Sequence, residues 1–186
     1  MAILASGSKV TIRNIQMEDI DQFVQWWNNG DLMASVGFRK GLGITKEQLE
    51  PKFTKQIAEK NPLKCDNRLY MILDLETKKA IGELAYGQLD IEKGSCRIGM
   101  KICELSYQGH GYGEDALITF INYLYKELGL EKIEIDTLAD NLRALSLYEK
   151  VGFVRTSEVK NYWTDPDGIS HDVVFLELNK EDWHLY

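Results

Sequence analysis

Gln108-Gly109-His110-Gly111-Tyr112-Gly113 separates two segments of opposite periodicity. Upstream, residues 95–103 (SCRIGMKIC) alternate in polarity, which predicts a strand. Downstream, apolar residues recur at helical spacing ahead of Gly129, which predicts a helix ending near that glycine: Ala116, Leu117, Phe120, Ile121, Leu124 and Leu128. The chain is therefore expected to contain a strand–turn–helix unit with glycines at its turn.

The glycines of this turn allow positive φ and let an outside group approach the backbone closely. The N-terminus of the following helix has unpaired N–H groups and a partial positive charge, so the turn can hold a phosphate or pyrophosphate. No Gly-Lys-Ser/Thr follows, which excludes a Walker A loop, and Glu114 and Ala116 stand where a dinucleotide fingerprint needs glycine. A glycine-rich structural turn is the alternative.

Residues 130–153 (LEKIEIDTLADNLRALSLYEKVGF) are the second informative stretch. Its first part alternates like a strand, Asp140-Asn141 is typical of a helix start, and Gly152 of a helix end. Asn141 and Tyr148 are seven residues apart and therefore share one helix face. Periodicity alone favours a core position for Tyr148.

Together these stretches resemble the GNAT superfamily of acyl-CoA-dependent N-acetyltransferases. The resemblance rests on Q-x-x-G-x-G at Gln108–Gly113 and N-x-x-A-x-x-x-Y-E-K-x-G-F at Asn141–Phe153, and it covers roughly residues 80 to 180. It implies a mixed α/β fold with a central, mostly antiparallel twisted sheet, a parallel splayed strand pair at the acyl-CoA site, and flanking helices. Residues 9–186 are expected to form a single acetyltransferase domain after a flexible tail over residues 1–8.

The resemblance also implies acetyl-CoA as cosubstrate. Backbone amides of the turn and of the helix start at Glu114 would hold the pyrophosphate, while Asp115 and Glu114 favour the helix dipole and can point outward. The end of the preceding strand would pair with the pantetheine arm, and one of its N–H groups would polarise the thioester carbonyl. The expected cofactor-binding residues are Lys101, Ile102, Cys103, Gln108, Gly109, His110, Gly111, Tyr112, Gly113, Glu114 and Asn141, of which Asn141 would bind pantetheine.

Tyr148 matches the family's general acid, which protonates the departing thiolate. A thiol of pKa ~8.5 is a good leaving group, so a phenol of pKa ~10 can supply this proton. The base that removes the proton of the amine is open. Glu83, Glu104 and His171 are candidates, and each also suits a solvated or structural role.

Composition narrows the partners. The chain has 186 residues and a net charge of −7, which argues against nucleic acid and suits a cationic acceptor. Cys65, Cys96 and Cys103 lack C-x-x-C spacing and histidines are few, so no metal site is expected. No apolar run reaches the ~20 residues of a membrane helix, and Met1–Ser8 lacks signal-peptide features. We therefore expect a cytoplasmic protein with no membrane partner.

Thr11–Ile20 (T-I-R-x-I-x-x-x-D-I), the I-G-E around Gly82 and the late Asp172 strand resemble one GNAT branch. That branch includes ribosomal-protein, spermidine and aminoglycoside 6′-acetyltransferases. The Tyr148 of this chain favours acetyl transfer to a primary amine of a small cationic acceptor, a polyamine or an aminosugar. Acetylation of a ribosomal-protein or other peptide N-terminus is one alternative, and a non-catalytic acyl-CoA-binding regulatory module is another. The oligomeric state is open, with a homodimer among the alternatives.

The first third of the chain contains less informative patterns. Ile20, Phe23, Val24 and Trp27 recur at helical spacing, which predicts an amphipathic helix with that stripe in the core. Trp26 falls off the stripe and is expected to be partly exposed or to line the acceptor pocket. Residues 30–43 are predicted to be a loop. The capping box at residues 45–48 opens a helix in which Pro51 is expected to cause a kink or a restart.

The remaining strands follow from alternation and turn residues. They are expected at residues 9–15, 68–74, 79–90, 155–162 and 173–178, with Asp165-Pro166-Asp167-Gly168 as the turn between the last two.

Overall fold

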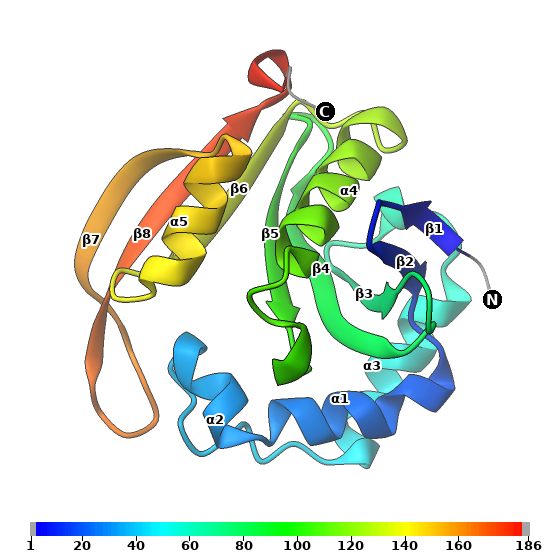
Figure 1. The fold of residues 1–186 in the computed structure, drawn as a ribbon, viewed down its shortest axis with the longest axis horizontal. Coiled ribbons are helices and arrows are strands. Elements are labelled where there is room, and N and C mark those ends of the chain that lie inside the picture. The colour runs from blue at the N-terminus through cyan, green and yellow to red at the C-terminus, as the bar shows by residue number, and fades with distance from the viewer. Residues whose placement is uncertain (1–2, 184–186) are drawn as a thin grey trace. The chain divides into compact units, whose positions relative to one another are not determined.

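The computed structural model describes residues 3–183 (Figure 1). The strands are β1 (Ile3–Ser6), β2 (Val10–Asn14), β3 (Arg68–Asp74), β4 (Ala80–Asp90), β5 (Ser95–Ile102), β6 (Lys132–Leu138), β7 (Val154–Thr164) and β8 (Ser170–Asn179). The α-helices are α1 (Ile20–Trp27), α2 (Gly30–Met33), α3 (Lys46–Ala58), α4 (Tyr112–Lys126) and α5 (Leu142–Val151), with short 3₁₀ segments between some of the elements.

The strands form a mixed sheet in the order β1-β2-β3-β4-β5-β6-β8-β7, with one parallel pair. The β1–β2, β2–β3, β3–β4, β4–β5 and β7–β8 ladders are antiparallel. In the β4–β5 ladder, Glu83 lies opposite Lys101. The mixed α/β fold with a mostly antiparallel sheet, predicted from the family resemblance, is confirmed.

The chain folds as two compact units, each built from separate stretches of sequence. Unit 1 comprises Met1–Ile15, Glu59–Glu134 and Leu178–Tyr186, and so holds β1 to β5, α4 and the start of β6. Unit 2 comprises Gln16–Ala58 and Ile135–Glu177, and so holds α1, α2, α3, α5, β7 and most of β8. Each unit has its own buried apolar residues.

In unit 1, α4 packs on β1, β2 and β5 (Figure 1). Five residues of the predicted spacing are buried, Ala116, Leu117, Phe120, Ile121 and Leu124, and Thr119, Tyr123 and Tyr125 are buried as well. The Phe120 ring meets that of Tyr70 on β3 at a centroid distance of 5.3 Å. The helix ends at Lys126, earlier than predicted, and Gly129 follows with φ 68°. The expected role of Gly129 beyond the helix end agrees with this left-handed conformation.

Residues 1 and 2 of the flexible tail expected at residues 1–8 lie outside the described residues, and residues 3–8 differ from that expectation. Ile3–Ser6 forms β1, which pairs with β2. The N–H of Gly7 donates to the Val10 carbonyl at 2.9 Å and closes the turn between these strands. A Cβ on Gly7 would lie 2.4 Å from the Asp115 carboxylate, so glycine permits this close approach to α4. The segment is too short for alternation to predict its pairing.

In unit 2, α1 buries a stripe next to the predicted one. Ile20, Phe23 and Trp26 are buried, whereas Trp27 is half-buried. The expectation of a partly exposed Trp26 is wrong, because its side chain is only 4% exposed and its ring lies 5.9 Å from that of Phe23. A place for Trp26 in the wall of the acceptor pocket stays a prediction. Phe23 also contacts Phe53 of α3 at 5.4 Å. Helical spacing alone does not separate adjacent stripes, and packing against α3 selects this one.

Residues 30–43 are not entirely a loop, since they begin with α2. The Asn29 side chain accepts the Leu32 N–H at 3.1 Å as a cap, and Leu32 is buried. At α3 the predicted capping box is present in part, with the Gln48 side chain accepting the Thr45 N–H at 2.8 Å. A single helix then spans Pro51, so the restart expected there does not occur. Proline removes one N–H donor, and the remaining helical bonds continue past it.

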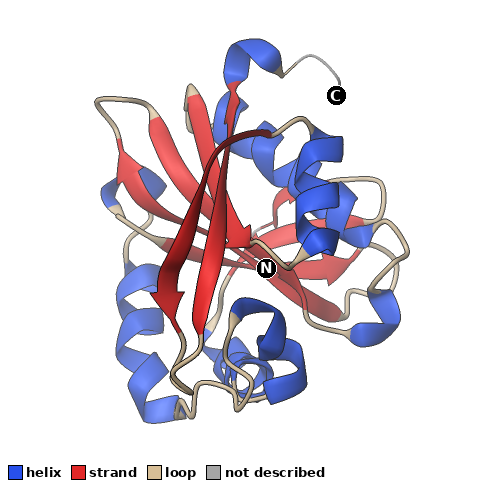
Figure 2. Ribbon diagram, turned by 90° about the vertical axis from the view of Figure 1, so that its left-hand side faces the viewer, coloured by secondary structure: helices blue, strands red, loops and turns tan. Residues whose placement is uncertain are grey.

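Unit 2 ends in an antiparallel hairpin in which β7 and β8 run side by side (Figure 2). The predicted turn is confirmed: the Gly168 N–H donates to the Asp165 carbonyl at 2.9 Å. The register shifts between Val159 and Trp163, where Asn161 adopts φ 50°. Such a bulge and the charged side chains of β7 limit pairing at an edge strand.

Candidate active site

The glycine-rich turn lies in unit 1 between β5 and α4 (Figure 1). Gly109 and Gly111 adopt φ 80° and 83°, as the glycine spacing predicts, and Gly111 is the N-cap of α4. Gln108 fixes the start of the turn, because its side-chain Nε2 donates to the Ile102 carbonyl at 2.8 Å. The turn is therefore tied to the end of β5 on one side and leads directly into the helix on the other.

The first backbone amides of α4 are oriented for an anion. The first helical hydrogen bond runs from the Asp115 N–H to the Gly111 carbonyl at 3.0 Å, so the N–H groups of Tyr112 and Gly113 have no partner within the helix. A Cβ added at Gly109 would have no neighbouring atom of the described chain within 4 Å. An open approach, helix-terminal N–H groups and the positive end of the dipole together fit a pyrophosphate.

Asp115 is held by the β1–β2 turn. Its Oδ1 accepts the N–H and the hydroxyl of Ser8 at 2.9 and 2.7 Å, and its Oδ2 accepts the N–H groups of Lys9 and Val10 at 2.8 and 3.0 Å. Burial would raise the pKa of Asp115, but the hydrogen bonds from Lys9, Ser8 and Val10 outweigh it and lower that pKa. The carboxylate thus anchors the N-terminal hairpin to the first turn of α4.

One tyrosine and two lysines beside the turn, Tyr107, Lys9 and Lys79, were not identified from the sequence, whereas Tyr112 was. The Tyr112 hydroxyl donates to Asp74 Oδ2 at 2.9 Å, and its ring meets the edge of the Tyr107 ring at 4.9 Å. Lys9 Nζ lies 5.3 Å from the centre of the Tyr112 ring, and Lys79 Nζ lies 5.8 Å from that of Tyr107. These residues come from distant parts of the chain, so no local pattern could have linked them.

At the end of β5, the N–H of Ile102 points away from β4. The neighbouring Cys103 N–H donates to the Ile81 carbonyl at 2.8 Å, and successive N–H groups of an antiparallel strand alternate between its two sides. Among the predicted residues 101–103, Ile102 is therefore the one whose N–H is directed away from the β4 ladder. Burial raises the pKa of the Cys103 thiol, which disfavours the reactive thiolate.

Asn141 lies at the start of α5 in unit 2, where the sequence placed it. Its Oδ1 accepts the Ala144 N–H at 3.2 Å as a helix cap, and its Nδ2 donates to the Ser35 carbonyl at 3.4 Å. Gly152 ends α5 with φ 115°. The expected helix start and end are confirmed, and the cap leaves the second N–H of the Asn141 amide as a donor.

Tyr148 is on α5 in unit 2. Its side chain is 6% exposed, and its ring lies 6.1 Å from that of Phe153. Burial, followed by the charge of Asp136, raises the pKa of Tyr148 to about 12. No group within residues 3–183 hydrogen-bonds its hydroxyl. The phenol is therefore protonated at neutral pH and available as a donor, and its burial also suits the core position that periodicity favours.

The two glutamates considered as bases are in ion pairs in unit 1. Glu83 pairs with Lys101 at 3.5 Å, and Glu104 pairs with Lys79 at 2.5 Å. Each of these carboxylates thus already has an ammonium group as its partner. His110, in the glycine-rich turn, is exposed.

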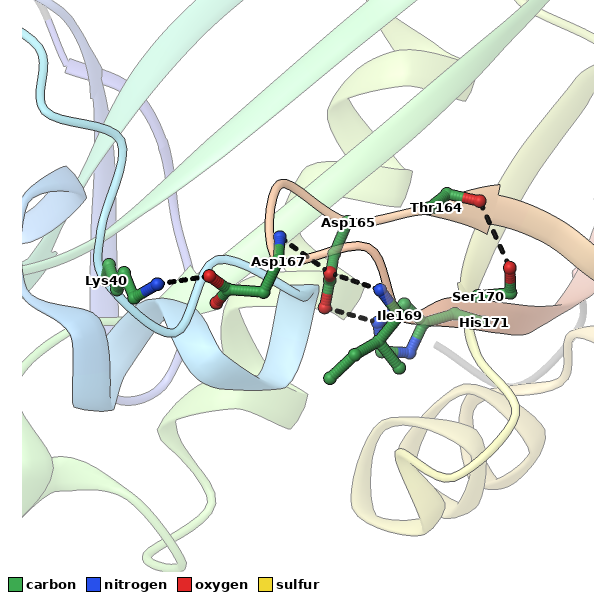
Figure 3. A network of polar contacts seen from close by, with 7 residues as sticks. All are labelled: Lys40, Thr164, Asp165, Asp167, Ile169, Ser170 and His171. Carbon is green, nitrogen blue, oxygen red and sulfur yellow. Dashed lines mark hydrogen bonds and ion pairs between the residues drawn. The ribbon is translucent and has the colours of Figure 1, made fainter.

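His171 belongs to the polar network at the tip of the β7–β8 hairpin in unit 2 (Figure 3). Its Nε2 lies 2.9 Å from Asp165 Oδ2, and the pair is buried. Asp165 Oδ1 accepts the N–H groups of Asp167 and Ile169, both at 2.9 Å (Figure 3). The hydrogen bond from His171 and these N–H groups lower the pKa of Asp165. His171 thus takes part in holding the hairpin turn.

Within residues 3–183, no group of His, Cys, Asp and Glu side chains has a metal-binding arrangement. In the same part of the chain, no helix combines the length and apolar character needed to cross a membrane. Of the predicted site residues, the turn and the end of β5 lie together in unit 1, and Asn141 and Tyr148 lie together on α5 in unit 2.

The acetyltransferase (GNAT) domain model matches residues 9–154, and the chain belongs to this family. A Bacillus licheniformis protein described as an uncharacterized N-acetyltransferase is 23% identical over 177 residues, 94% of this chain and 95% of its own length. A Klebsiella pneumoniae aminoglycoside N(6′)-acetyltransferase is 26% identical over 167 residues, 88% of this chain and 81% of its own length.

The fold is similar to that of a Vibrio cholerae spermidine N-acetyltransferase crystallised with CoA and spermine. That structure has a TM-score of 0.83 and 21% identity, covering 95% of this chain and 98% of the other. GNAT enzymes use acetyl-CoA as cosubstrate, and this chain is an acetyl-CoA-dependent N-acetyltransferase. The resemblance inferred from the two sequence motifs is confirmed.

Proposed function

We propose that the enzyme transfers the acetyl group of acetyl-CoA to a primary amine of a small cationic acceptor, a polyamine or an aminosugar. The named relatives include a spermidine acetyltransferase with bound spermine and an aminoglycoside acetyltransferase, which supports this acceptor class. The net charge of −7 also supports it, because an acidic protein attracts cationic substrates. In this reaction the amine attacks the thioester carbonyl, the carbon–sulfur bond breaks, and the amine proton leaves through a base.

The observation that carries the proposal is the turn at residues 109–113 with its helix-terminal amides. The backbone N–H groups of Tyr112 and Gly113, ahead of the first helical hydrogen bond, would take the pyrophosphate of the coenzyme. Gln108 would keep this turn in register with the end of β5 through its bond to the Ile102 carbonyl. His110 and Glu114 complete the predicted binding segment, with their main chain as the contact.

Among residues 101–103, the orientation of its N–H favours Ile102 as the donor to the thioester carbonyl. A main-chain donor placed where negative charge develops lowers the barrier without having to reorganise during the reaction. Lys101 and Cys103 would align the pantetheine through their main chain, and Asn141 would donate its free amide N–H to it. Lys101 is already paired with Glu83, which suits a main-chain role.

Tyr148 would donate a hydrogen bond to the departing thiolate. A phenol with a pKa of about 12 is protonated at every physiological pH. Full proton transfer from such a phenol to a thiolate whose thiol has a pKa of ~8.5 is uphill. The hydrogen bond from Tyr148 to the sulfur would therefore supply most of the stabilisation of the departing thiolate. The thiolate would take up its proton later, when the site is exposed to water.

The test is a panel of amines assayed with acetyl-CoA by detection of the released thiol. Spermidine, spermine, kanamycin and ribosomal N-terminal peptides are compared, with product masses to locate the acetyl group. We expect turnover with a polyamine or an aminosugar. Turnover with the peptides alone would contradict the small cationic acceptor and favour a peptide N-terminus as the acceptor. Tight CoA binding with no turnover on any amine would favour a non-catalytic regulatory module.

A further inference from the structure

Lys9 has a backbone fixed from both sides at the edge of the glycine-rich turn. Its N–H donates to Asp115 Oδ2 at 2.8 Å, and its carbonyl accepts the Leu75 N–H at 2.8 Å. The first bond joins Lys9 to the first turn of α4, and the second joins it to the turn after β3. The Cα of Lys9 therefore has a defined position beside α4, although its side chain is exposed.

The side chain of Lys9 extends along the turn. Its Cε and Cδ lie 3.5 and 3.8 Å from the position that a Cβ of Gly111 would occupy, and its Nζ lies 5.3 Å from the centre of the Tyr112 ring. No carboxylate within residues 3–183 pairs with this ammonium group. The face of the Tyr112 ring attracts the Lys9 ammonium group and keeps it beside the turn. The N–H donors of this ammonium group stay available for a further partner.

Tyr112 is itself held in place. Its hydroxyl donates to Asp74 Oδ2 at 2.9 Å, and its ring packs against Tyr107. Asp74 is fixed by the N–H groups of Glu76 and Thr77, at 3.1 and 2.7 Å. The ring beneath the Lys9 ammonium therefore belongs to a rigid hydrogen-bonded assembly rather than to a freely rotating side chain.

We propose that the Lys9 ammonium contacts the pyrophosphate of the coenzyme. The proposal rests on the proposed role of the turn at residues 109–113, and it adds a side-chain cation from a different part of the chain. The turn supplies N–H donors and a helix dipole, but none of its side chains carries a permanent positive charge. Lys9 supplies that charge at the Gly111 side of the turn, where the helix amides begin.

Lys79 is the matched comparison. Its Nζ also lies over a tyrosine ring, 5.8 Å from the centre of Tyr107, but it is paired with Glu104 at 2.5 Å. A lysine whose charge is compensated by a carboxylate attracts a phosphate less strongly. Lys9 and Lys79 therefore share the contact with a tyrosine ring, but only Lys79 has its charge compensated by a carboxylate.

The experiment measures the binding of CoA and dephospho-CoA to the purified protein by isothermal titration calorimetry. The variants are Lys9→Met, which keeps much of the stem but removes the charge, Lys9→Arg, which keeps the charge, and Lys79→Met. For Lys9→Met we expect roughly tenfold weaker binding of both ligands and a smaller loss of affinity when salt is raised. Lys9→Arg should retain most of the affinity, and Lys79→Met should bind within about twofold of wild type.

Equal affinities of wild type and Lys9→Met would overturn the contact. A loss seen with CoA and absent with dephospho-CoA would also overturn the assignment, because it would place Lys9 at the 3′-phosphate. Melting temperatures measured on the same samples exclude a folding defect as the cause of a loss. Failure of the wild-type protein to bind CoA is a separate result, and it would instead remove the proposed role of the turn.

Discussion

The hydroxyl of Tyr112 donates a hydrogen bond to Asp74 Oδ2 at 2.9 Å, across 38 residues of sequence. This bond joins the last residue of β3 to the first residue of α4. We expect Tyr112→Phe to lower the free energy of unfolding measurably, because the ring is kept and one hydrogen bond to a carboxylate is lost. Urea unfolding followed by circular dichroism measures the change.

Tyr107→Phe is the control for this variant. Tyr107 packs edge-on against Tyr112, but no group within residues 3–183 hydrogen-bonds its hydroxyl. Removing that hydroxyl should therefore leave stability nearly unchanged. If Tyr112→Phe and Tyr107→Phe lost equal amounts of stability, the hydrogen bond to Asp74 would not be the cause of the loss.

Asp115→Asn should destabilise the hairpin at the start of unit 1. Residues 8–10 direct three backbone N–H groups and one hydroxyl at this carboxylate, and an amide in its place would set an NH₂ against N–H donors. We expect a loss of about 2 kcal/mol at neutral pH. Asp31→Asn, an exposed acidic residue in the first turn of α2, is the control and should be neutral.

The pH dependence of this loss has a defined sign. The folded-state pKa of Asp115 is lowered from the ordinary 3.8, so its stabilisation is present above that value and disappears as pH falls through the folded value. The difference in melting temperature between wild type and Asp115→Asn should therefore shrink below pH 3.8. Calorimetry over an acid series measures it, and a difference that grows on acidification would contradict the assignment.

Gly109→Ala should weaken CoA binding by more than it weakens the fold. Gly109 has φ 80° and no described atom within 4 Å of an added Cβ, so the methyl group costs about 1 kcal/mol in backbone strain and occupies the open approach to the amides. We expect at least a tenfold loss of CoA affinity. Gly43→Ala, at φ 62° and also with nothing described within 4 Å, should show a similar strain cost and no loss of affinity.

Tyr148→Phe should lower kcat about 100-fold with KM for acetyl-CoA nearly unchanged, since a proton or hydrogen bond is lost from the transition state alone. Because the pKa of Tyr148 is about 12, its ionisation should not appear in the wild-type kcat profile below pH 10. Tyr162→Phe is the control, because Tyr162 is an exposed tyrosine on β7. Undiminished turnover by Tyr148→Phe would remove the tyrosine from the mechanism.

Local patterns in the sequence predicted much of unit 1. The strands at residues 68–74 and 95–102 lie within one residue of their predicted bounds. Positive φ at Gly109 and Gly111 was likewise predictable from residue type. The helix holding Asn141 and Tyr148 could be placed from its cap and its terminal glycine.

Contacts between distant residues could not be predicted in this way. The hydrogen bond from Lys9 to Asp115 spans 106 residues, and neither residue belongs to a motif that specifies the other. Packing, rather than periodicity, decides that α1 buries Trp26 in preference to Trp27. The same holds for the base candidates, because the partners that hold Glu83, Glu104 and His171 are visible only in the folded chain.

The most direct measurement is a titration of the isotopically labelled protein with CoA, followed by amide proton and nitrogen chemical shifts. Hydrogen bonding to phosphate moves amide protons downfield. We predict that the largest downfield shifts belong to residues 109–114, and that they are retained with dephospho-CoA. Saturating CoA that leaves these amides unmoved while shifting others would contradict the assignment of the glycine-rich turn as the pyrophosphate site.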